Sequence, residues 1–404
     1  MKKTRRKKAV RKLKLKGGAL KRKVCFVITS FIHYSRNLFV LEELKNHPGV
    51  ELHILIGGTA LLSKYSSKFA HILEILKRDG YRNIYELHFN VEGSDHIAKA
   101  KTVGLGITEF STYFNHIRPD VVVVRGDRFE VLAAAAAAAS MNIPVAHIEG
   151  GDLSGTLDES IRHSITKLSH IHFTTNDEAR KRVIRMGEDP NYVFNFGSPD
   201  IEVVSRIVNG KTRADLSKTG SGADFDFTKP YLMVMFHPVS TEVDHIREQT
   251  RLLASAIHEL GVPTLWFWPN FDAGAEELSH ELRTFRDEVP NIKIRFMRYL
   301  APKDFISLLK NTSCLVGNSS AGIKESSLLG IPVVNIGSRQ QNRLRGKNVV
   351  DVDYHGEKIK DTITKQLKVG RYPKSSLYEG KDTSKRIAGI LATVKLYVQK
   401  KFVE

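Results

Sequence analysis

The sequence is poor in cysteine and has no long apolar run. Only Cys25 and Cys314 occur among its 404 residues, and each stands in a short apolar run that is typical of a buried strand. This usage argues against a disulfide framework and favours a reducing compartment. No stretch reaches the roughly 18 continuous apolar residues that a membrane span requires. We therefore expect a cytoplasmic protein without a transmembrane segment.

Acidic residues are missing from residues 1–23, which hold thirteen of the 62 Lys and Arg residues. Because the whole chain has a formal net charge of +18, these thirteen cations leave only +5 on the remainder. Such a segment cannot bury a core, so it is predicted to be a disordered basic tail. It also lacks the apolar core of a secretory signal. The tail is the one candidate site for nucleic acid or an anionic surface, and a solvated arm without chemical function is the alternative.

From Val24 onward, short apolar runs alternate with helical patterns. The runs VCFVITS, VELHILIGG, DVVVVRGD and IPVAHIEGG are apolar on both faces, as in parallel strands covered by helices on both sides. Helical segments lie between them, including HIAKAKTVGLGITEFSTYFNHI and the alanine-rich FEVLAAAAAAASMN. The same alternation of strand and helix patterns begins again at YLMVMFHP. The pattern predicts an α/β protein with two Rossmann-like, doubly wound domains and a cleft between them.

The polar interval at residues 209–230 marks the predicted connection between the two halves. We expect the basic tail at 1–23, an N-terminal Rossmann-like domain at 24–205 and a nucleotide-binding Rossmann-like domain at 206–380. A helix within 381–404 is expected to pack back on the first domain. Ligands of open α/β sheets bind outside the carboxyl ends of the strands, so the residues that follow each strand are the candidates for a site.

Reactive side chains follow several of the predicted strands. Each alone has a structural explanation, such as a helix cap, an ion pair or a packed histidine. Carboxylates brought together in one cleft raise one another's pKa, which prepares a general acid beside a general base. No His and Cys spacing suits a metal, and neither a metal nor a cofactor is expected. The strand-end residues are Asp127, Glu149, His237, Asn270, Asp272, Ser319 and Ser320.

The segment GNSSAGIKE, residues 317–325, predicts an anion site at the start of a helix. Ser319 or Ser320 would cap the helix, and the N–H groups that follow would face a phosphate. The segment is neither a Walker loop nor a dinucleotide G-x-G-x-x-G motif. Glu325, one turn later, is placed to accept hydrogen bonds from ribose hydroxyls. An ordinary helix cap is the alternative.

Several blocks, read in order from Val24 to about residue 355, carry a family resemblance. They are GDRFE, HIEGGDLSGTLDESIRHSITKLSH, FHP, NFDAG, GNSSAGIKE and IPVVNIGSRQQNR. Together they resemble the hydrolysing UDP-N-acetylglucosamine 2-epimerases that start sialic-acid synthesis. The loop HIEGG…SGT.D.SIRH resembles this hydrolysing branch more than the non-hydrolysing bacterial branch.

The resemblance implies a GT-B glycosyltransferase-type fold, a nucleotide-sugar substrate and a homodimer or homotetramer. It also implies removal of the carbon 2 proton as UDP leaves carbon 1, followed by addition of water to the resulting glycal. The acid/base group would be Asp127, Glu149 and Asp158, with Arg162 and His237 orienting the acids or the leaving phosphate. The implied substrate-binding residues are Asn270, Ser319, Ser320, Gly322, Glu325 and Arg343.

One loop departs from the family pattern. A G-x-R-A-D-Y type loop usually follows the first strand, whereas this chain has TSFIHYSRN without an arginine at that place. His33 and Arg36 are the candidates to replace it. The departure keeps open a UDP- or GDP-linked 2,4-diacetamido-2,4,6-trideoxy sugar as substrate. A GT-B glycosyltransferase is the alternative from another class, and a nucleic-acid-binding protein rests on the basic tail alone.

Overall fold

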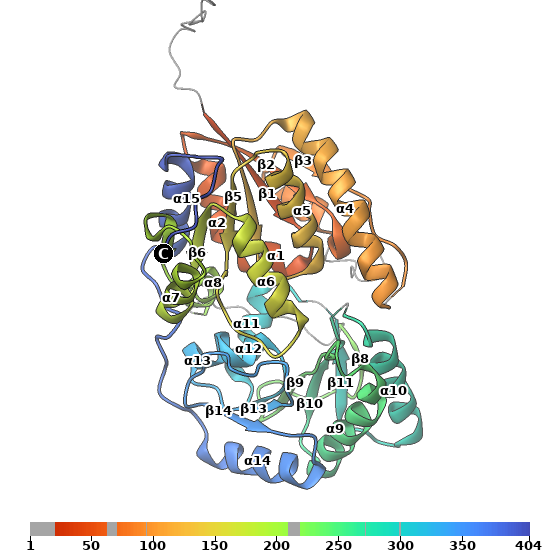
Figure 1. The fold of residues 1–404 in the computed structure, drawn as a ribbon. Helices are drawn as coiled ribbons and strands as arrows, with labels where there is room; N and C mark the ends of the chain where they lie inside the picture. The colour runs from red at the N-terminus through yellow and green to blue at the C-terminus, as the bar shows by residue number, and fades with distance from the viewer. Residues whose placement is uncertain (1–20, 63–70, 94, 209–218, 271, 299) are drawn as a thin grey trace, which may run out of the picture.

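The computed structural model describes residues 21–62, 71–93, 95–208, 219–270, 272–298 and 300–404. Two α/β domains are stacked, the first in red to yellow and the second in green to blue (Figure 1). Most of the expected basic tail lies outside the described residues. Strand β1 (Arg22–Ile28) includes Arg22 and Lys23, so these two residues belong to the first sheet and not to a disordered tail.

The sheet of the first domain is parallel, with the order β3-β2-β1-β4-β5-β6-β7 in the described part of the chain. The order reverses between β1 and β4, which is the switch point of a doubly wound sheet. The other strands are β2 (Val50–Ile56), β3 (Asn83–Glu86), β4 (Val121–Arg125), β5 (Val145–Ile148), β6 (Ile171–Thr174) and β7 (Val193–Asn195).

Helices cover both faces of this sheet (Figure 1). The alanines at 133–139 allow two helices to approach closely, because a Cβ on Gly106 would lie 2.9 Å from the Cβ of Ala133. The helices are α1 (Phe31–Arg36), α2 (Leu38–Asn46), α3 (Ile72–Arg78), α4 (His96–Ile117), α5 (Phe129–Ser140), α6 (Leu157–Leu168), α7 (Asp177–Arg185) and α8 (Pro199–Ile207), with 3-10 turns at η1 (Gly58–Leu61) and η3 (Pro190–Tyr192).

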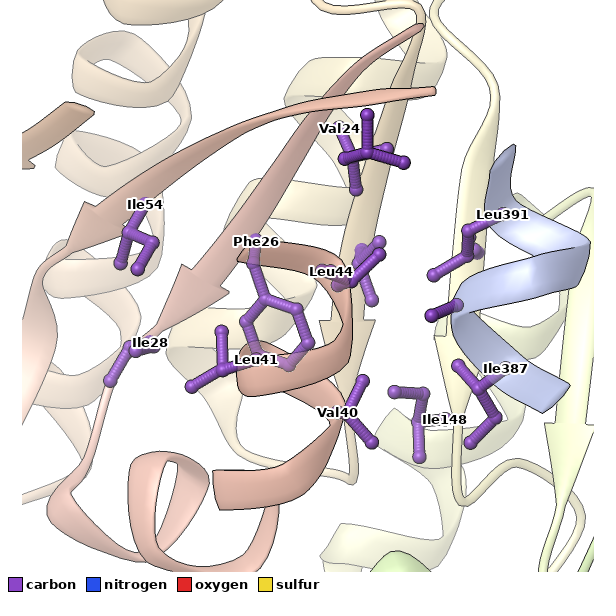
Figure 2. Packing of buried hydrophobic residues seen from close by; sticks show 14 of the residues in the cluster. Val24, Phe26, Ile28, Val40, Leu41, Leu44, Ile54, Ile148, Ile387 and Leu391 are labelled. Atoms are coloured by element: carbon purple, nitrogen blue, oxygen red, sulfur yellow. The ribbon is translucent and has the colours of Figure 1, made fainter. Parts of the chain in front are cut away.

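The C-terminal helix α15 (Thr383–Thr393) packs on the first domain (Figure 2). Its Ile387 and Leu391 join Phe26 of β1 and Leu44 of α2 in one buried cluster. Full burial of one such side chain stabilises the fold by about 1.5–3 kcal/mol. The helix ends at Thr393 and so occupies only part of the expected range of 381–404.

The second domain repeats the doubly wound order, β14-β13-β12-β9-β10-β11, and β8 pairs antiparallel with β11 at one edge. Two Rossmann-like, doubly wound domains were predicted, and the prediction is confirmed. The strands are β8 (Ser221–Gly222), β9 (Leu232–Met235), β10 (Thr264–Phe267), β11 (Ile294–Met297), β12 (Cys314–Gly317), β13 (Val333–Ile336) and β14 (Val349–Val352).

The helices of the second domain follow the same alternation. A single helix was expected from Ala321, but the chain forms two short helices that meet at Lys324. Among the helices of the described residues, none combines the length and apolar content needed to cross a membrane. The helices are η5 (Val243–His245), α9 (Ile246–Leu260), α10 (Ala275–Glu288), α11 (Pro302–Asn311), α12 (Ser320–Ile323), α13 (Glu325–Leu329) and α14 (Gly356–Val369).

Candidate active site

A cleft of about 500 Å³ lies between the two domains and is lined by residues that follow strands of both sheets. The sequence-predicted site residues gather here, with one exception. Gly322 is not among the described residues that line the cleft. A Cβ at this position would lie 3.0 Å from Val333 Cγ1 and 3.1 Å from Leu315 Cδ2, so Gly322 serves close packing of α12 on the sheet. The predicted residues in the cleft are Asp127, Glu149, Asp158, Arg162, His237, Asn270, Ser319, Ser320, Glu325 and Arg343.

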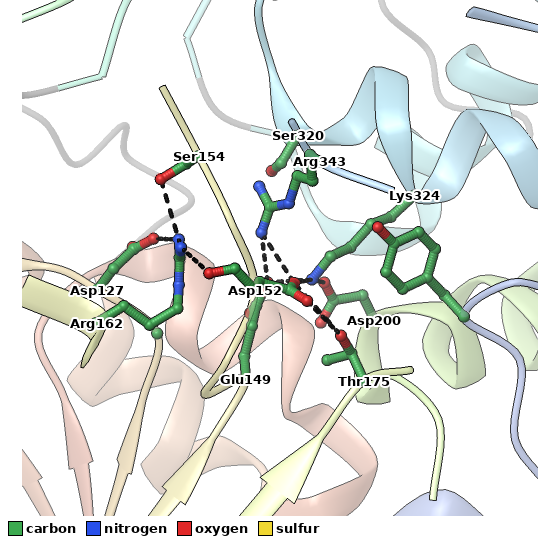
Figure 3. Close-up of polar contacts among 12 residues, drawn as sticks. Asp127, Glu149, Asp152, Ser154, Arg162, Thr175, Asp200, Ser320, Lys324 and Arg343 are labelled. Carbon is green, nitrogen blue, oxygen red and sulfur yellow. Dashed lines mark hydrogen bonds and ion pairs between the residues drawn. The ribbon is translucent and has the colours of Figure 1, made fainter. Parts of the chain in front are cut away.

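Asp127 faces the cleft from the end of β4 and is held by Arg162 of α6 (Figure 3). The side chain of Arg162 is 1% exposed, whereas that of Asp127 is 29% exposed. Arg162 also donates through Nη1 to the carbonyl oxygen of Asp152 at 2.9 Å and to Ser154 Oγ at 3.4 Å. The guanidinium is therefore fixed from three sides, and it orients a carboxylate that stays open to a ligand.

Glu149 follows β5 with a φ of 73°, in the left-handed region that non-glycine residues rarely occupy. Its Oε2 accepts from Arg125 Nη2 at 2.8 Å, and its Oε1 accepts from Arg343 Nη2 at 3.2 Å and from Lys324 Nζ. Burial favours the neutral acid, but Lys324, Arg125 and Arg343 outweigh it and hold the pKa of Glu149 well below its usual range. Glu149 is thus a fixed carboxylate whose ionised form is favoured by its neighbours.

Two further buried carboxylates, Asp152 and Asp200, surround Glu149 (Figure 3). Asp152 Oδ2 lies 3.2 Å from Arg343 Nη2, and Asp152 Oδ1 accepts from Asn176 Nδ2 at 3.0 Å. Asp200 is paired with Arg125. These residues, together with Arg125 and Lys324, were missed by the sequence analysis, although a charged residue at the end of an apolar run such as DVVVVR is a usable signal.

The surroundings of Asp158 shift its pKa in the opposite direction to that of Glu149. Burial raises its pKa, and the nearby carboxylate of Asp272 from the second domain raises it further, against a smaller lowering by Arg339 and Arg128. Arg339 Nη2 lies 3.4 Å from Asp272 Oδ2, which favours the charge on Asp272. A carboxyl group whose pKa is raised in this way is suited to act as a general acid.

His237 is fixed at the end of the β9 run by Asn318. The backbone N–H of His237 donates to Asn318 Oδ1 at 2.8 Å, and Asn318 Nδ2 donates back to the carbonyl oxygen of His237 at 2.8 Å. The ring Nδ1 accepts from the backbone N–H of Asn270 at 3.1 Å. Burial, with a smaller effect of Arg339, lowers the pKa of His237 to about 3. The neutral ring therefore carries its proton on Nε2, where it can donate to a ligand.

The predicted anion site lies at the start of α12. Ser319 caps this helix, since its Oγ accepts from the backbone N–H of Ala321 at 3.3 Å. With only four residues, α12 supplies a smaller dipole than a longer helix would. Arg36 of α1 supplies the missing charge, because its Nη2 lies 3.0 Å from Ser320 Oγ and 3.1 Å from Glu325 Oε1.

Of the two candidates to replace the family arginine, Arg36 reaches the anion site. His33 also lines the cleft, but its Nδ1 faces the backbone N–H of Thr29 at 3.3 Å. Burial, reinforced by Arg125 and Arg128, lowers the pKa of His33 well below its usual value, so its ring is neutral. Glu325 Oε2 is buried and has no hydrogen-bond partner among the described residues, which leaves an acceptor for a ligand hydroxyl.

The cleft thus brings together the serines at the start of α12, Arg36, and carboxyl groups whose pKa values are shifted in opposite directions. Within the described ranges, no group of three or more His, Cys, Asp or Glu side chains is arranged to hold a metal ion.

Comparison with curated proteins gives two relatives of nearly equal similarity. The chain is 33% identical over 375 residues to the UDP-N-acetylglucosamine 2-epimerase of Neisseria meningitidis serogroup B, covering 90% of this chain and 94% of the relative. It is 32% identical over 378 residues to the hydrolysing UDP-N,N'-diacetylbacillosamine 2-epimerase of Legionella pneumophila, covering 94% and 97%.

Solved structures of such enzymes share the fold. The UDP-GlcNAc 2-epimerase of Methanocaldococcus jannaschii, in complex with UDP-GlcNAc and UDP, matches with a TM-score of 0.73 and 19% identity over 92% of this chain and 99% of that chain. The Neisseria meningitidis enzyme bound to UDP-GlcNAc matches with a TM-score of 0.73 and 17% identity over 91% and 99%. These neighbours confirm the predicted GT-B-like architecture. The sequence profile of UDP-N-acetylglucosamine 2-epimerases matches residues 42–392, and this chain belongs to that family.

Proposed function

We propose that this enzyme is a hydrolysing 2-epimerase that converts UDP-N-acetylglucosamine to N-acetylmannosamine and UDP. The observation that carries the proposal is the pair of carboxyl groups with opposite electrostatics in one cleft. Glu149 is held ionised by cations, whereas the pKa of Asp158 is raised by burial and by Asp272. Epimerisation by elimination and addition needs a proton taken from carbon 2, a fixed negative charge near carbon 1 and a proton returned to carbon 2, and Asp127, Glu149 and Asp158 are assigned to these three roles in turn.

Nucleotide binding is assigned to the wall formed by the second domain and Arg36. The diphosphate would lie against Ser319, Ser320 and the guanidinium of Arg36, which lines the cleft. The unpartnered Oε2 of Glu325 would accept from a ribose hydroxyl. These donors take up the charge that develops on UDP as it leaves, which lowers the barrier to elimination.

Elimination is assigned to the opposite wall. Asp127, whose carboxylate is oriented by Arg162 and open to the cleft, takes the proton from carbon 2. The electron pair of that C–H bond forms the carbon 1–carbon 2 double bond, and the carbon 1–oxygen bond breaks to release UDP. Positive charge that develops at carbon 1 is stabilised by the fixed carboxylate of Glu149.

Hydration of the glycal completes the reaction. A water oxygen bonds to carbon 1 and loses a proton to solvent, while Asp158 delivers its proton to the opposite face of carbon 2. The products are the free 2-epimer and UDP, and the carboxyl groups return to their starting states by proton exchange with water. His237 donates from Nε2 to the departing phosphate, in keeping with its neutral ring.

A UDP- or GDP-linked 2,4-diacetamido-2,4,6-trideoxy sugar is the second candidate substrate. The Legionella pneumophila relative, with 32% identity, is named for UDP-N,N'-diacetylbacillosamine. One wall of the cleft is apolar, with Val103, Leu132 and Ile161 among its lining residues. An apolar wall suits the methyl group that replaces the carbon 6 hydroxymethyl in such sugars.

Product analysis tests the proposal. The purified enzyme should release UDP and N-acetylmannosamine from UDP-N-acetylglucosamine, or the corresponding free 2-epimer from UDP- or GDP-diacetylbacillosamine. Asp127→Asn and Glu149→Gln should each stop release. Release of nucleotide only when an acceptor sugar is added would instead select a glycosyltransferase. The homodimer or homotetramer implied by the family stays a proposal, which light scattering on the purified enzyme tests.

A further inference from the structure

Lys324 is a buried cation at the junction of α12 and α13. Its side chain is 0% exposed, and Lys324 is not among the described residues that line the cleft. Its Nζ is paired with Glu149 Oε1 and lies 3.7 Å from both Asp152 Oδ2 and Asp200 Oδ2 (Figure 3). The ring of Tyr378 covers the ammonium at 5.5 Å. A buried ammonium is costly to desolvate, so its carboxylate partners are essential to its placement.

The contacts of Lys324 join the two domains. The three carboxylates belong to the first domain, whereas Lys324 directly follows α12, whose start carries Ser319 and Ser320. Lys324 thus connects the wall assigned to the diphosphate with the carboxylate assigned to carbon 1. This placement has no signal in the local sequence pattern, because Glu149 and Lys324 are 175 residues apart.

Among the residues that the structure describes, Lys324 is one of four cations that surround the three carboxylates of Glu149, Asp152 and Asp200. Without its ammonium, Oε1 of Glu149 would keep only Arg343 at 3.2 Å, beside two like-charged carboxylates. The neighbouring rings of His33, His147 and Tyr378 are buried and add no compensating cation, since the pKa of each histidine is lowered and that of the phenol is raised. The charged groups around Glu149 are Arg36, Arg125, Lys324, Arg343, Asp152 and Asp200.

We infer that Lys324 is a positioning residue for this reaction, which fixes the ionised Glu149 carboxylate in the cleft without touching the substrate. The inference rests on the proposed function. A residue of this kind affects the chemical step more than binding, because it orients a group that acts in the transition state.

The test compares the Lys324→Met variant with the wild-type enzyme, each acting on the best nucleotide-sugar substrate of the wild type. Lys324→Met should lower kcat about 30-fold and change KM less than about threefold, because one charge-assisted contact to Glu149 is lost. Loss of the cation raises the pKa of Glu149, so the acidic limb of the kcat profile should move to higher pH. Lys324→Arg keeps the charge and should recover most of kcat.

A matched control is Lys360→Met. Lys360 of α14 pairs with Glu357 of the same helix and with Glu259 of α9, none of which lines the cleft, and its replacement should leave kcat and the pH profile unchanged. Circular dichroism and thermal unfolding check that Lys324→Met is folded. The double variant Lys324→Met/Asp200→Asn removes one charge of each sign and remains the test if the single variant unfolds.

Wild-type kcat and an unmoved acidic limb in either folded variant would overturn the inference. A loss confined to KM would also overturn it, because Lys324 would then act in binding. An inactive wild-type enzyme on every nucleotide sugar would instead contradict the proposed function, so the two failures are distinct.

Discussion

Arg36 and Glu325 meet across the cleft, with Nη2 of the arginine 3.1 Å from Oε1 of the glutamate. Arg36 comes from α1 of the first domain, and Glu325 opens α13 of the second. The same Nη2 lies 3.0 Å from Ser320 Oγ, at the start of α12. Arg36, three residues beyond His33, is therefore our proposed source of the cation that the first loop lacks at the family's usual place.

Arg36→Met should weaken UDP binding. One charge-assisted hydrogen bond to a phosphate contributes about 1.5–3 kcal/mol, so the Kd for UDP should rise about 10- to 100-fold. Isothermal titration calorimetry measures this directly. Arg78→Met is the control, because Arg78 is exposed on α3 and pairs with Asp79 away from the cleft. Equal UDP affinity in the wild type and Arg36→Met would contradict the assignment of Arg36 to the diphosphate.

Asp272→Asn should change the pH dependence of kcat at its basic limb. Asp272 raises the pKa of Asp158, so removal of its charge lowers that pKa. Proton delivery by Asp158 is lost as pH rises through its pKa, and the basic limb should therefore move to lower pH in the variant. Asp287→Asn, on the exposed end of α10, should leave the limb in place. A limb that stays fixed in Asp272→Asn would exclude Asp158 as the acid.

Gly155→Ala should reduce activity by separating the two domains. A Cβ at Gly155 would lie 1.9 Å from the carbonyl oxygen of Ser338, which follows β13 in the second domain. Misplacement of reacting groups by about 1 Å costs roughly 100-fold, so a fall in kcat of at least about tenfold is expected. Steady-state kinetics measures the change.

Gly104→Ala is the matched control for Gly155→Ala. Within the described part of the chain, a Cβ on Gly104 in α4 meets no atom closer than 4 Å. This replacement should stabilise the protein by about 0.5–1 kcal/mol in thermal unfolding and leave kcat unchanged. If Gly155→Ala also keeps full activity, the close contact between Gly155 and Ser338 has no role in catalysis.

Deletion of residues 1–20 should leave activity intact. Within the described part of the chain, the residues that line the cleft begin at Ser30, so we expect the reaction to proceed without residues 1–20. Any binding of a polyanion such as heparin should fall in the deletion, and its dependence on salt should weaken. Comparison of kcat and of heparin retention at two salt concentrations tests both statements. Loss of kcat in the deletion would give the tail a role in catalysis.

The positions of the site residues at strand ends were predictable, because the apolar run of each parallel strand stops where the next polar side chain reaches the cleft. Asp127, Glu149 and His237 were located in this way, and all three line the cleft. Likewise, the segment at residues 96–117 reads as a helix from its apolar spacing, and α4 spans His96–Ile117. Local sequence patterns predict these strands and this helix because the formation of each depends on residues that are close together in the chain.

Contacts between distant residues were not predictable from local patterns. Arg125 and Asp200 are 75 residues apart, and their pairing depends on the packing of α8 against helices of both domains. The break at Lys324 was also missed, because its ammonium bonds to carboxylates of the other domain and no glycine or proline marks the position. Gly322 was assigned to the diphosphate from its place in GNSSAGIKE, but its missing side chain serves packing.

The most direct test of the central claim is to run the reaction in deuterium oxide and to analyse the products by mass spectrometry and NMR. Candidate substrates are UDP-N-acetylglucosamine and UDP- or GDP-diacetylbacillosamine. Elimination followed by hydration predicts UDP or GDP and the free 2-epimer, with one deuterium at carbon 2. A product that still carries the nucleotide, or a free sugar with its original carbon 2 hydrogen and configuration, would contradict the account.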